Sequence, residues 1–298
     1  MSAVDLNYPA ARFAEFLAGR GLVTRRTIAF AGLSTLAVVD TSASQAAGDL
    51  AVAKGLAGYY HVIDAVEPEQ QPGVYGYYWY KRYGSAQHDA WRTAFAFEYA
   101  TLDSLRGYDC VAQVIDGDLD GDIPYYLMHY YKRGSLAADA SGRGWDLPVD
   151  FVVRVSQDVA LGLGALHARG IVHRDLNAEN VLLKEDGGAV IADLGCARAL
   201  DAPPTEPRRR PDEFHWPPEY AESYDTASVE ADIYGLGVLM YQMTVGRMPR
   251  HSGPGCAEGA RIGRYPAALT TVADACLEYQ PKNRPASIEE VLKQLAVV

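Results

Sequence analysis

The chain has 298 residues, of which 49% are hydrophobic and 22% are charged, so it is long enough to form one large globular domain or two lobes with a sizeable core. Its formal net charge is -11, and this acidic balance argues against a general nucleic-acid binder, because contacts with phosphates need clustered Lys and Arg. No apolar run reaches the length that spans a bilayer, so we expect no membrane partner.

The cysteines favour a reducing compartment. Four are present, Cys110, Cys196, Cys256 and Cys276, and no two of them form a CxxC pair. A zinc site or a disulfide framework therefore does not fit, and reduced thiols are typical of a cytoplasmic protein. Residues 24–47 contain two arginines followed by small and apolar residues, which resembles a twin-arginine export signal. We interpret this segment instead as one or two β-strands joined to the main domain.

The first part of the chain is expected to be rich in strands. Residues 8–22 place Phe13, Phe16 and Leu17 at helical spacing, which predicts an amphipathic helix. Residues 27–82 alternate runs rich in Val, Ile and Tyr with Gly, Pro and Gln, a pattern typical of strands and turns. We expect residues 1–45 to form an N-terminal extension that packs on the first lobe or recruits a partner.

The later elements change from strands to helices. We expect a helix at residues 90–105, strands at 110–119 and 124–131, a long helix at 149–170, a buried helix at 229–246 that is apolar nearly all round, and a last helix at 288–295. This order predicts an α+β fold with two lobes. The β-rich N-lobe would take residues 46–131 and the helical C-lobe residues 132–298.

Polar residues interrupt two apolar stretches in the second part of the chain. His173, Asp175 and Asn180 lie in IVHRDLNAENVLL, and Asp193 follows in IADLGCAR. A carboxylate and a carboxamide in a segment of buried character need a chemical reason, because an unpaired buried polar group is costly. The two motifs resemble the catalytic loop and the metal-binding loop of the eukaryotic-type protein kinases.

This resemblance implies a role for each polar group. Phosphoryl transfer needs a positioned nucleophile and a metal that neutralises the charge of the triphosphate. Asp175 would accept or orient the proton of the substrate hydroxyl. Asn180 and Asp193 would hold Mg²⁺ through oxygen atoms, which are the hard ligands that this ion prefers.

Three further positions follow the pattern of the same family. Glu219 in PPEY matches the end of the activation segment, and Arg284 in NRP stands where the family keeps an Arg that pairs with that Glu. Asp232 matches the Asp of the buried helix that anchors the backbone of the catalytic loop. Together they favour a protein kinase over the small-molecule phosphotransferases that share an HxD loop.

The resemblance also requires a strand Lys that binds the α- and β-phosphates and a helical Glu that pairs with it. We predict Lys81 in YYWYKRY and Glu98 in AFAFEYATLDSL, which are 17 residues apart. Lys54 is the rival, but it lies 44 residues before Glu98, which exceeds the usual short connection. Leu102, one turn beyond Glu98, would join His173 and Leu194 in the apolar stack of active kinases.

The nucleotide would then contact a loop, a strand and a hinge. The segment KGLAGYYHV is interpreted as the phosphate-covering loop, with an ordinary hairpin as the alternative. Its members would be Gly55, Ala57, Gly58 and Val62, and the adenine site would add Met128 at the gatekeeper place, the hinge from His129 to Tyr131, and Leu182. ATP and Mg²⁺ are therefore the expected cofactors.

Several residues depart from the family pattern. Asn177 stands where Ser/Thr kinases usually have a Lys that neutralises the moving phosphoryl group, and Trp79 would crowd an adenine ring beside Lys81. Thr205 is the phosphorylatable residue of the activation segment, and Arg174 is placed to pair with a phosphate there.

The sequence therefore predicts a Mg²⁺-dependent protein kinase that transfers the ATP γ-phosphate to a protein hydroxyl, with Ser/Thr favoured over Tyr. A pseudokinase that binds nucleotide or acts as a scaffold is the alternative, because of Asn177, Trp79 and the altered Gly-rich loop. A kinase of small molecules is the third reading. Neither the protein substrate nor the oligomeric state follows from the sequence.

Overall fold

The computed structural model describes residues 8–30, 33–41, 50–58, 88–202, 215–224, 228–249 and 264–298. The chain divides into two compact units. The first comprises Met1–Arg106 and Gln113–Tyr130, and the second comprises Gly107–Ala112 and Tyr131–Val298. The division between residues 130 and 131 lies next to the lobe boundary expected from the sequence.

The first unit is built on a five-stranded antiparallel sheet. Its strands are β1 (Val23–Phe30), β2 (Thr35–Asp40), β3 (Leu50–Gly55), β4 (Val114–Asp118) and β5 (Tyr125–His129). Their order across the sheet is β1-β2-β3-β5-β4, so β3 lies in the middle. In the register between β3 and β5, Ala53 is paired with Leu127 and Lys54 with Tyr126.

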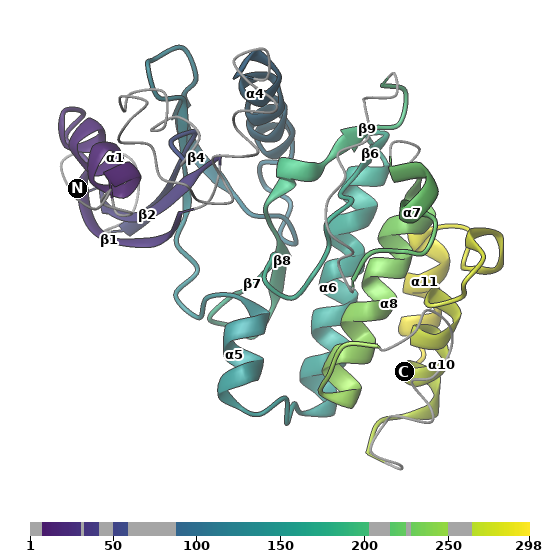
Figure 1. Cartoon of the computed structure of the whole chain (residues 1–298). Helices are drawn as coiled ribbons and strands as arrows, with labels where there is room; N and C mark the ends of the chain where they lie inside the picture. Colours follow the sequence, from purple (N-terminus) through teal and green to yellow (C-terminus); the bar gives the residue numbers. More distant parts are fainter. Residues whose placement is uncertain are drawn as a thin grey trace, which may run out of the picture. The chain divides into compact units, whose positions relative to one another are not determined.

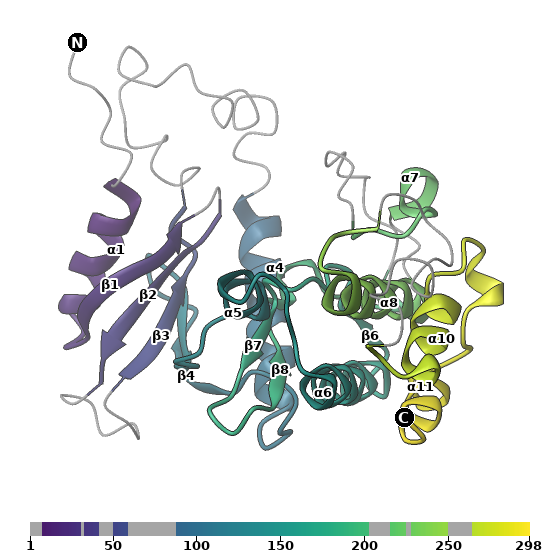
Figure 2. The same cartoon turned by 90° about the horizontal axis from the view of Figure 1, so that it is seen from below.

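The two faces of this sheet carry different partners. Because side chains alternate along a strand, Ala51 and Ala53 share one face and Val52 and Lys54 the other. The helix α1 (Tyr8–Ala18) covers the alanine face, where Phe13 and Leu17 are fully buried. The helix α4 (His88–Ser104) supplies the partner of Lys54 on the opposite face. Figure 2 shows α1 and α4 on opposite sides of the strands.

The N-terminal helix was predicted correctly, but residues 1–45 do not form a separate extension. The strands β1 and β2 belong to the sheet of the first unit, since β2 pairs with β3 along its whole length. The helix α1 also belongs to this unit, because its aromatic face closes the core of the sheet. The expected boundary at residue 45 therefore cuts through one folded body.

The second unit is mainly helical (Figure 1). Its helices are α5 (Leu136–Gly142), α6 (Val149–His167), α7 (Tyr220–Ser223), α8 (Val229–Val245), α10 (Ala267–Cys276) and α11 (Ile288–Leu295). Two short antiparallel pairs accompany them, β6 (Ile171–Val172) with β9 (Arg198–Ala199) and β7 (Val181–Leu183) with β8 (Ala189–Ile191). The expected long, buried and final helices are therefore all present.

The helix α8 is the centre of the second unit. It packs against α6 and α10, and most of its residues are buried on every side, as its apolar sequence predicts. Two glycines allow this close packing, because a Cβ at Gly237 would lie 2.8 Å from Cys276 Cβ and one at Gly235 would lie 3.2 Å from Leu176 Cβ. The loop that follows β6 therefore rests on the backbone of α8.

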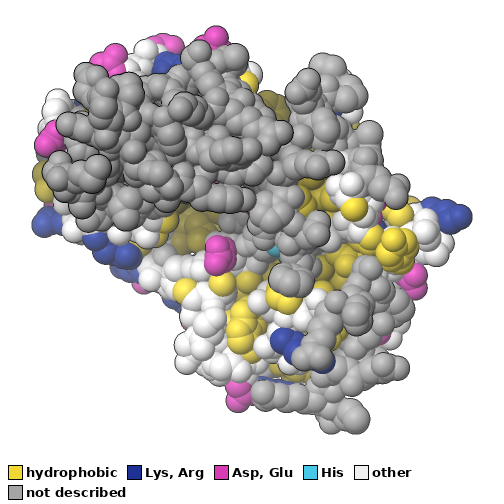
Figure 3. Space-filling model, viewed as in Figure 1, with side chains coloured by type: hydrophobic (Ala, Val, Ile, Leu, Met, Phe, Trp, Pro, Cys, Tyr) yellow, Lys and Arg dark blue, Asp and Glu magenta, His cyan; other side chains and the backbone are white. Residues whose placement is uncertain are grey.

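The surface agrees with the acidic composition. On the face drawn in Figure 3, hydrophobic side chains gather over the second unit, and Lys and Arg are scattered rather than joined in one basic stripe. Within the described part of the chain, no helix combines the length and apolar character needed to cross a membrane.

Candidate active site

A buried ion pair joins β3 to α4 in the first unit. Lys54 Nζ lies 2.7 Å from Glu98 Oε1 and 3.0 Å from Oε2. The Tyr126 hydroxyl, which faces the same side of the sheet, donates to Glu98 Oε1 at 3.1 Å. Lys54 is 5% exposed and Glu98 is 1% exposed. Each charge therefore depends on the other, because a single buried charge without a partner is strongly unfavourable.

The argument from spacing that excluded Lys54 as a partner of Glu98 is wrong, because Lys54 binds the Glu98 carboxylate. Lys81 and Trp79 lie outside the described residues. The spacing argument failed because it assumed a short connection between the Lys strand and the helix. Here residues 56–87 connect β3 to α4, and their length places no limit on which lysine can approach the helix.

The interpretation of residues 55–62 as the phosphate-covering loop is also wrong where it can be examined. Gly55 is the last residue of β3 and is paired with both Thr35 and Tyr125. A Cβ at Gly55 would lie 2.2 Å from Phe13 Cε2, so α1 fills the space above it. Ala57 belongs to the same buried core, Gly58 is buried, and Val62 lies outside the described residues. Residues 55–58 therefore belong to the core of the first unit.

The residues proposed for the adenine site fall in both units. Met128 is buried in β5 between Val52 and Val114, and the backbone N–H of His129 donates to Gln113 O at 2.9 Å. Tyr131 and Leu182 pack together against one apolar cluster of the second unit. That cluster comprises Ala112, Val190 and Ala192. Their contact with a nucleotide stays a prediction.

The catalytic loop is fixed to α8 by Asp232. This buried carboxylate accepts the backbone N–H of His173 and that of Arg174, each at 2.8 Å, and His167 Nε2 lies 2.8 Å from it. Burial raises the pKa of Asp232, but the hydrogen bond and charge of His167 and the charge of His173 outweigh burial, so the pKa lies below its ordinary value. The predicted anchor is therefore present.

His173 holds the same loop through contacts of both ring nitrogens. Its Nδ1 accepts the backbone N–H of Asp175 at 3.3 Å, and its Nε2 lies 3.1 Å from the carbonyl oxygen of Ala192. The two ring nitrogens therefore contact two different segments of the backbone. His173 therefore ties the loop that carries Asp175 to the segment that leads into Asp193.

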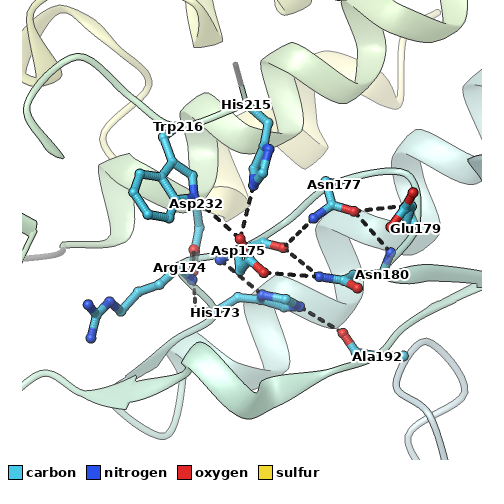
Figure 4. A network of polar contacts seen from close by, with 10 residues as sticks. All are labelled: His173, Arg174, Asp175, Asn177, Glu179, Asn180, Ala192, His215, Trp216 and Asp232. Carbon is cyan, nitrogen blue, oxygen red and sulfur yellow. Dashed lines mark hydrogen bonds and ion pairs between the residues drawn. The ribbon is translucent and has the colours of Figure 1, made fainter. Parts of the chain in front are cut away.

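Asp175 receives donors on both carboxylate oxygens. His215 Nε2 lies 2.9 Å from Oδ1, the indole N–H of Trp216 donates to the same oxygen at 3.3 Å, and Asn180 Nδ2 donates to Oδ2 at 3.4 Å. Figure 4 shows these side chains converging on the carboxylate. Burial raises the pKa of Asp175. The hydrogen bond and charge of His215 and the hydrogen bond of Trp216 lower this pKa by more than burial raises it, so the group is ionised at neutral pH.

Asn180 and Asp193 are brought close by the backbone. The N–H of Ala192, next to Asp193, donates to Asn180 O at 2.8 Å. The side-chain amide of Asn180 gives its Nδ2 to Asp175 O at 2.8 Å, which turns its Oδ1 away from Asp175 (Figure 4). Asp193 has the left-handed φ of 57° and is exposed. One amide oxygen and one carboxylate are the kind of donors that suit Mg²⁺, which keeps several waters.

Arg174 does not have the environment expected of a phosphate receptor. It is buried with a positive φ of 70°, lies over the Tyr224 ring at 3.9 Å, and donates Nη2 to Tyr224 O at 3.2 Å. Thr205, its expected phosphorylated partner, lies outside the described residues.

The end of the activation segment is held by a buried Arg. Arg284 Nη1 and Nη2 donate to Glu219 Oε1 and Oε2 at 2.6 and 2.8 Å. The same guanidinium also donates to the backbone oxygens of Glu278, Glu230 and Tyr279. This bidentate pair is the arrangement predicted from PPEY and NRP.

Residues 80–295 match the family model described as "Protein kinase domain". The chain belongs to the protein kinase family. The match begins at residue 80, so β1, β2, β3 and Lys54 lie before it. Members of the family use ATP and a divalent metal, and the two units correspond to the two lobes of this fold.

This kinase domain is similar to serine/threonine-protein kinases of bacteria. It is 37% identical over 204 residues to PkaA of Streptomyces coelicolor, covering 63% of this chain and 36% of that protein. It is 30% identical over 232 residues to serine/threonine-protein kinase A of Synechocystis, covering 67% and 43%. PknL of Mycobacterium tuberculosis is 33% identical over 159 residues, covering 53% and 39%. The chain thus spans less than half the length of these relatives.

The sequence reasoning rejected Lys54 and did not single out His215 or Trp216. Lys54 carried a usable signal, since LAVAK is a regular strand that ends in a lysine. His215 and Trp216 carried none, because nothing in EFHWPPEY predicts that two consecutive side chains approach a carboxylate 40 residues earlier.

Proposed function

We propose that this chain is an active serine/threonine-protein kinase that transfers the γ-phosphate of ATP to a hydroxyl of a protein substrate. The observation that carries the proposal is the ionised Asp175, held in a loop whose backbone is fixed by Asp232. The similarity to bacterial serine/threonine-protein kinases supports the choice of acceptor residue.

Each polar group has a role in this proposal. Asp175 accepts the proton of the substrate hydroxyl. Lys54, oriented by Glu98, binds the α- and β-phosphates. Asn180 and Asp193 hold Mg²⁺, which neutralises charge on the phosphate oxygens when bound. A protein that only served as a scaffold would have no chemical need for all of these groups.

The acceptor and the surroundings of the kinase are also part of the proposal. The substrate is a protein whose identity stays open, and a cytoplasmic location fits the reduced cysteines. Recruitment of a partner by residues 1–45 stays a prediction, although Phe13 and Leu17 of α1 are already buried by the chain's own sheet.

The test is transfer of label from γ-labelled ATP with Mg²⁺ to the chain itself and to a generic protein acceptor. We expect label on Ser or Thr with the wild type, and its loss in Asp175→Asn and in Asp193→Ala. Asp186→Asn is the matched control, since Asp186 is exposed in the turn between β7 and β8. ATP binding without transfer by the wild type would refute an active kinase.

A further inference from the structure

The two oxygens of the Asp175 carboxylate have different numbers of hydrogen-bond donors. Its Oδ1 has two donors, His215 Nε2 at 2.9 Å and Trp216 Nε1 at 3.3 Å. Its Oδ2 has one long contact, to Asn180 Nδ2 at 3.4 Å. Since each carboxylate oxygen offers about two lone-pair sites, Oδ1 is saturated and Oδ2 keeps an acceptor site.

Asn177 is uncharged, so it cannot supply the positive charge of the Lys that Ser/Thr kinases usually have at this position. Its Nδ2 donates to Asp175 O at 3.2 Å, and its Oδ1 accepts the backbone N–H groups of Glu179 and Asn180 at 2.8 and 3.2 Å. The side chain is therefore used to close the turn of the loop. Figure 4 shows the contacts of Asn177 with Asp175, Glu179 and Asn180.

The two donors on Oδ1 are themselves held in place. The Trp216 ring stacks on the Tyr224 ring with centroids 5.0 Å apart. The Arg174 guanidinium also lies over the Tyr224 ring, 3.9 Å from its centroid. Trp216 also meets His215 edge-on at 6.2 Å. His215 is largely buried, with 12% of its side chain exposed. A partly buried and stacked pair loses little freedom on holding the carboxylate, so it can fix the orientation of Asp175.

We propose that His215, supported by Trp216, is the positioning residue of the catalytic carboxylate, and that it holds Oδ1 so that Oδ2 accepts the proton of the substrate hydroxyl. This proposal rests on the proposed kinase function. The substrate O–H proton passes to Oδ2, the hydroxyl oxygen bonds to the γ-phosphorus, and the bond from that phosphorus to the β–γ bridging oxygen breaks, so that ADP leaves. Nε2 donates to Oδ1 throughout and does not contact the reacting atoms.

Two substitutions separate the hydrogen bond from the volume of the side chain. His215→Phe keeps an aromatic ring without a donor, whereas His215→Gln places an amide N–H near the position of Nε2. Trp216→Phe keeps the ring that stacks on Tyr224 and removes the indole donor. The measurements are kcat and the KM for ATP and for a protein acceptor, with thermal melting of each variant as the check on folding.

We expect kcat to fall about 100-fold in His215→Phe, since one preorganised donor is lost at the reacting centre. The KM for ATP should stay within about twofold, because nucleotide binding does not use Oδ1. His215→Gln should recover most of the lost kcat, and Trp216→Phe should have a smaller effect than His215→Phe.

The opposite results would overturn the inference. Unchanged or increased kcat in both His215 variants would mean that the contact between His215 and Asp175 does not assist transfer. An equal loss in His215→Phe and His215→Gln, with unchanged melting, would reject positioning through the Nε2 donor. A wild-type chain without transfer would instead reject the proposed function itself, so the two failures can be told apart.

Discussion

Lys54 Nζ and Glu98 Oε1 are 2.7 Å apart although 44 residues separate them in the chain. The pair joins the central strand of the sheet to α4, and the Tyr126 hydroxyl completes the surroundings of the carboxylate. The position of the lysine on the third strand is the one that the kinase mechanism requires. This relationship therefore favours Lys54 as the nucleotide-binding lysine of the proposed kinase.

The exchange of Lys54 for Met should abolish transfer while Lys81→Met should not. Loss of Lys54 removes the charge that holds the phosphates and leaves Glu98 buried without its cation. We expect kcat/KM for ATP to fall at least about 100-fold in Lys54→Met. Steady-state kinetics of both variants check this. Activity in Lys54→Met together with inactivity in Lys81→Met would restore the assignment made from sequence spacing.

Removal of Glu219 should destabilise the second unit. Arg284 has a fully buried side chain, and Glu219→Ala leaves this cation without its carboxylate. We expect the free energy of unfolding to fall by about 3 kcal/mol, the lower end for a broken buried pair, because Glu219 itself is partly exposed. Urea unfolding measures the loss. The control is the double change Glu219→Leu with Arg284→Met, which should cost less than the single change.

Asp232 should make the fold sensitive to acid. Its folded-state pKa lies below the unfolded value of about 3.9, so its contribution is fully present above that pH and is lost as the pH falls through the folded pKa. Asp232→Asn should be less stable than the wild type at pH 7, and the difference should shrink below about pH 4. Urea unfolding at several pH values tests this. A difference that stays constant down to pH 3 would contradict it.

Phe13 and Gly55 should show strong coupling. Phe13→Ala removes a fully buried ring and should cost about 3 kcal/mol of the free energy of unfolding. Gly55→Ala should also destabilise the fold, because its Cβ would lie 2.2 Å from Phe13 Cε2. Since the small side chain at 13 makes room for the new methyl group, the double variant should be more stable than the sum of the two losses predicts. Strict additivity would show that the two positions do not share one space.

Much of the second unit could be predicted from sequence because its signals are local. The motifs around Asp175, Asp193 and Asp232 are short, and each is held by contacts that the family pattern already implies. The long apolar pattern of α8 left one solution, a buried helix. The Glu219 and Arg284 pair was predicted from order along the chain and is confirmed by two short hydrogen bonds.

The errors in the first unit have a different origin. The boundary drawn at residue 45 separated β1 and β2 from the lobe, although residues 24–47 were interpreted as strands joined to the main domain. Their neighbours in the sheet are set by tertiary pairing, which no local pattern encodes. Lys54 was rejected on distance in sequence, although a long connection costs only about 0.6 kcal/mol for each doubling of its length. The glycines after Lys54 looked like a phosphate loop, but α1 covers Gly55 from the far side of the sheet.

The attachment of the catalytic loop to α8 has a consequence for hydrogen exchange. The backbone N–H groups of His173 and Arg174 are held by Asp232, and Leu176 lies against Gly235 of the same helix. These amides can meet solvent only when α8 itself comes away from its neighbours, which requires opening of the whole second unit. A loop at the site of chemistry should therefore exchange its protons with deuterium as slowly as the centre of the core.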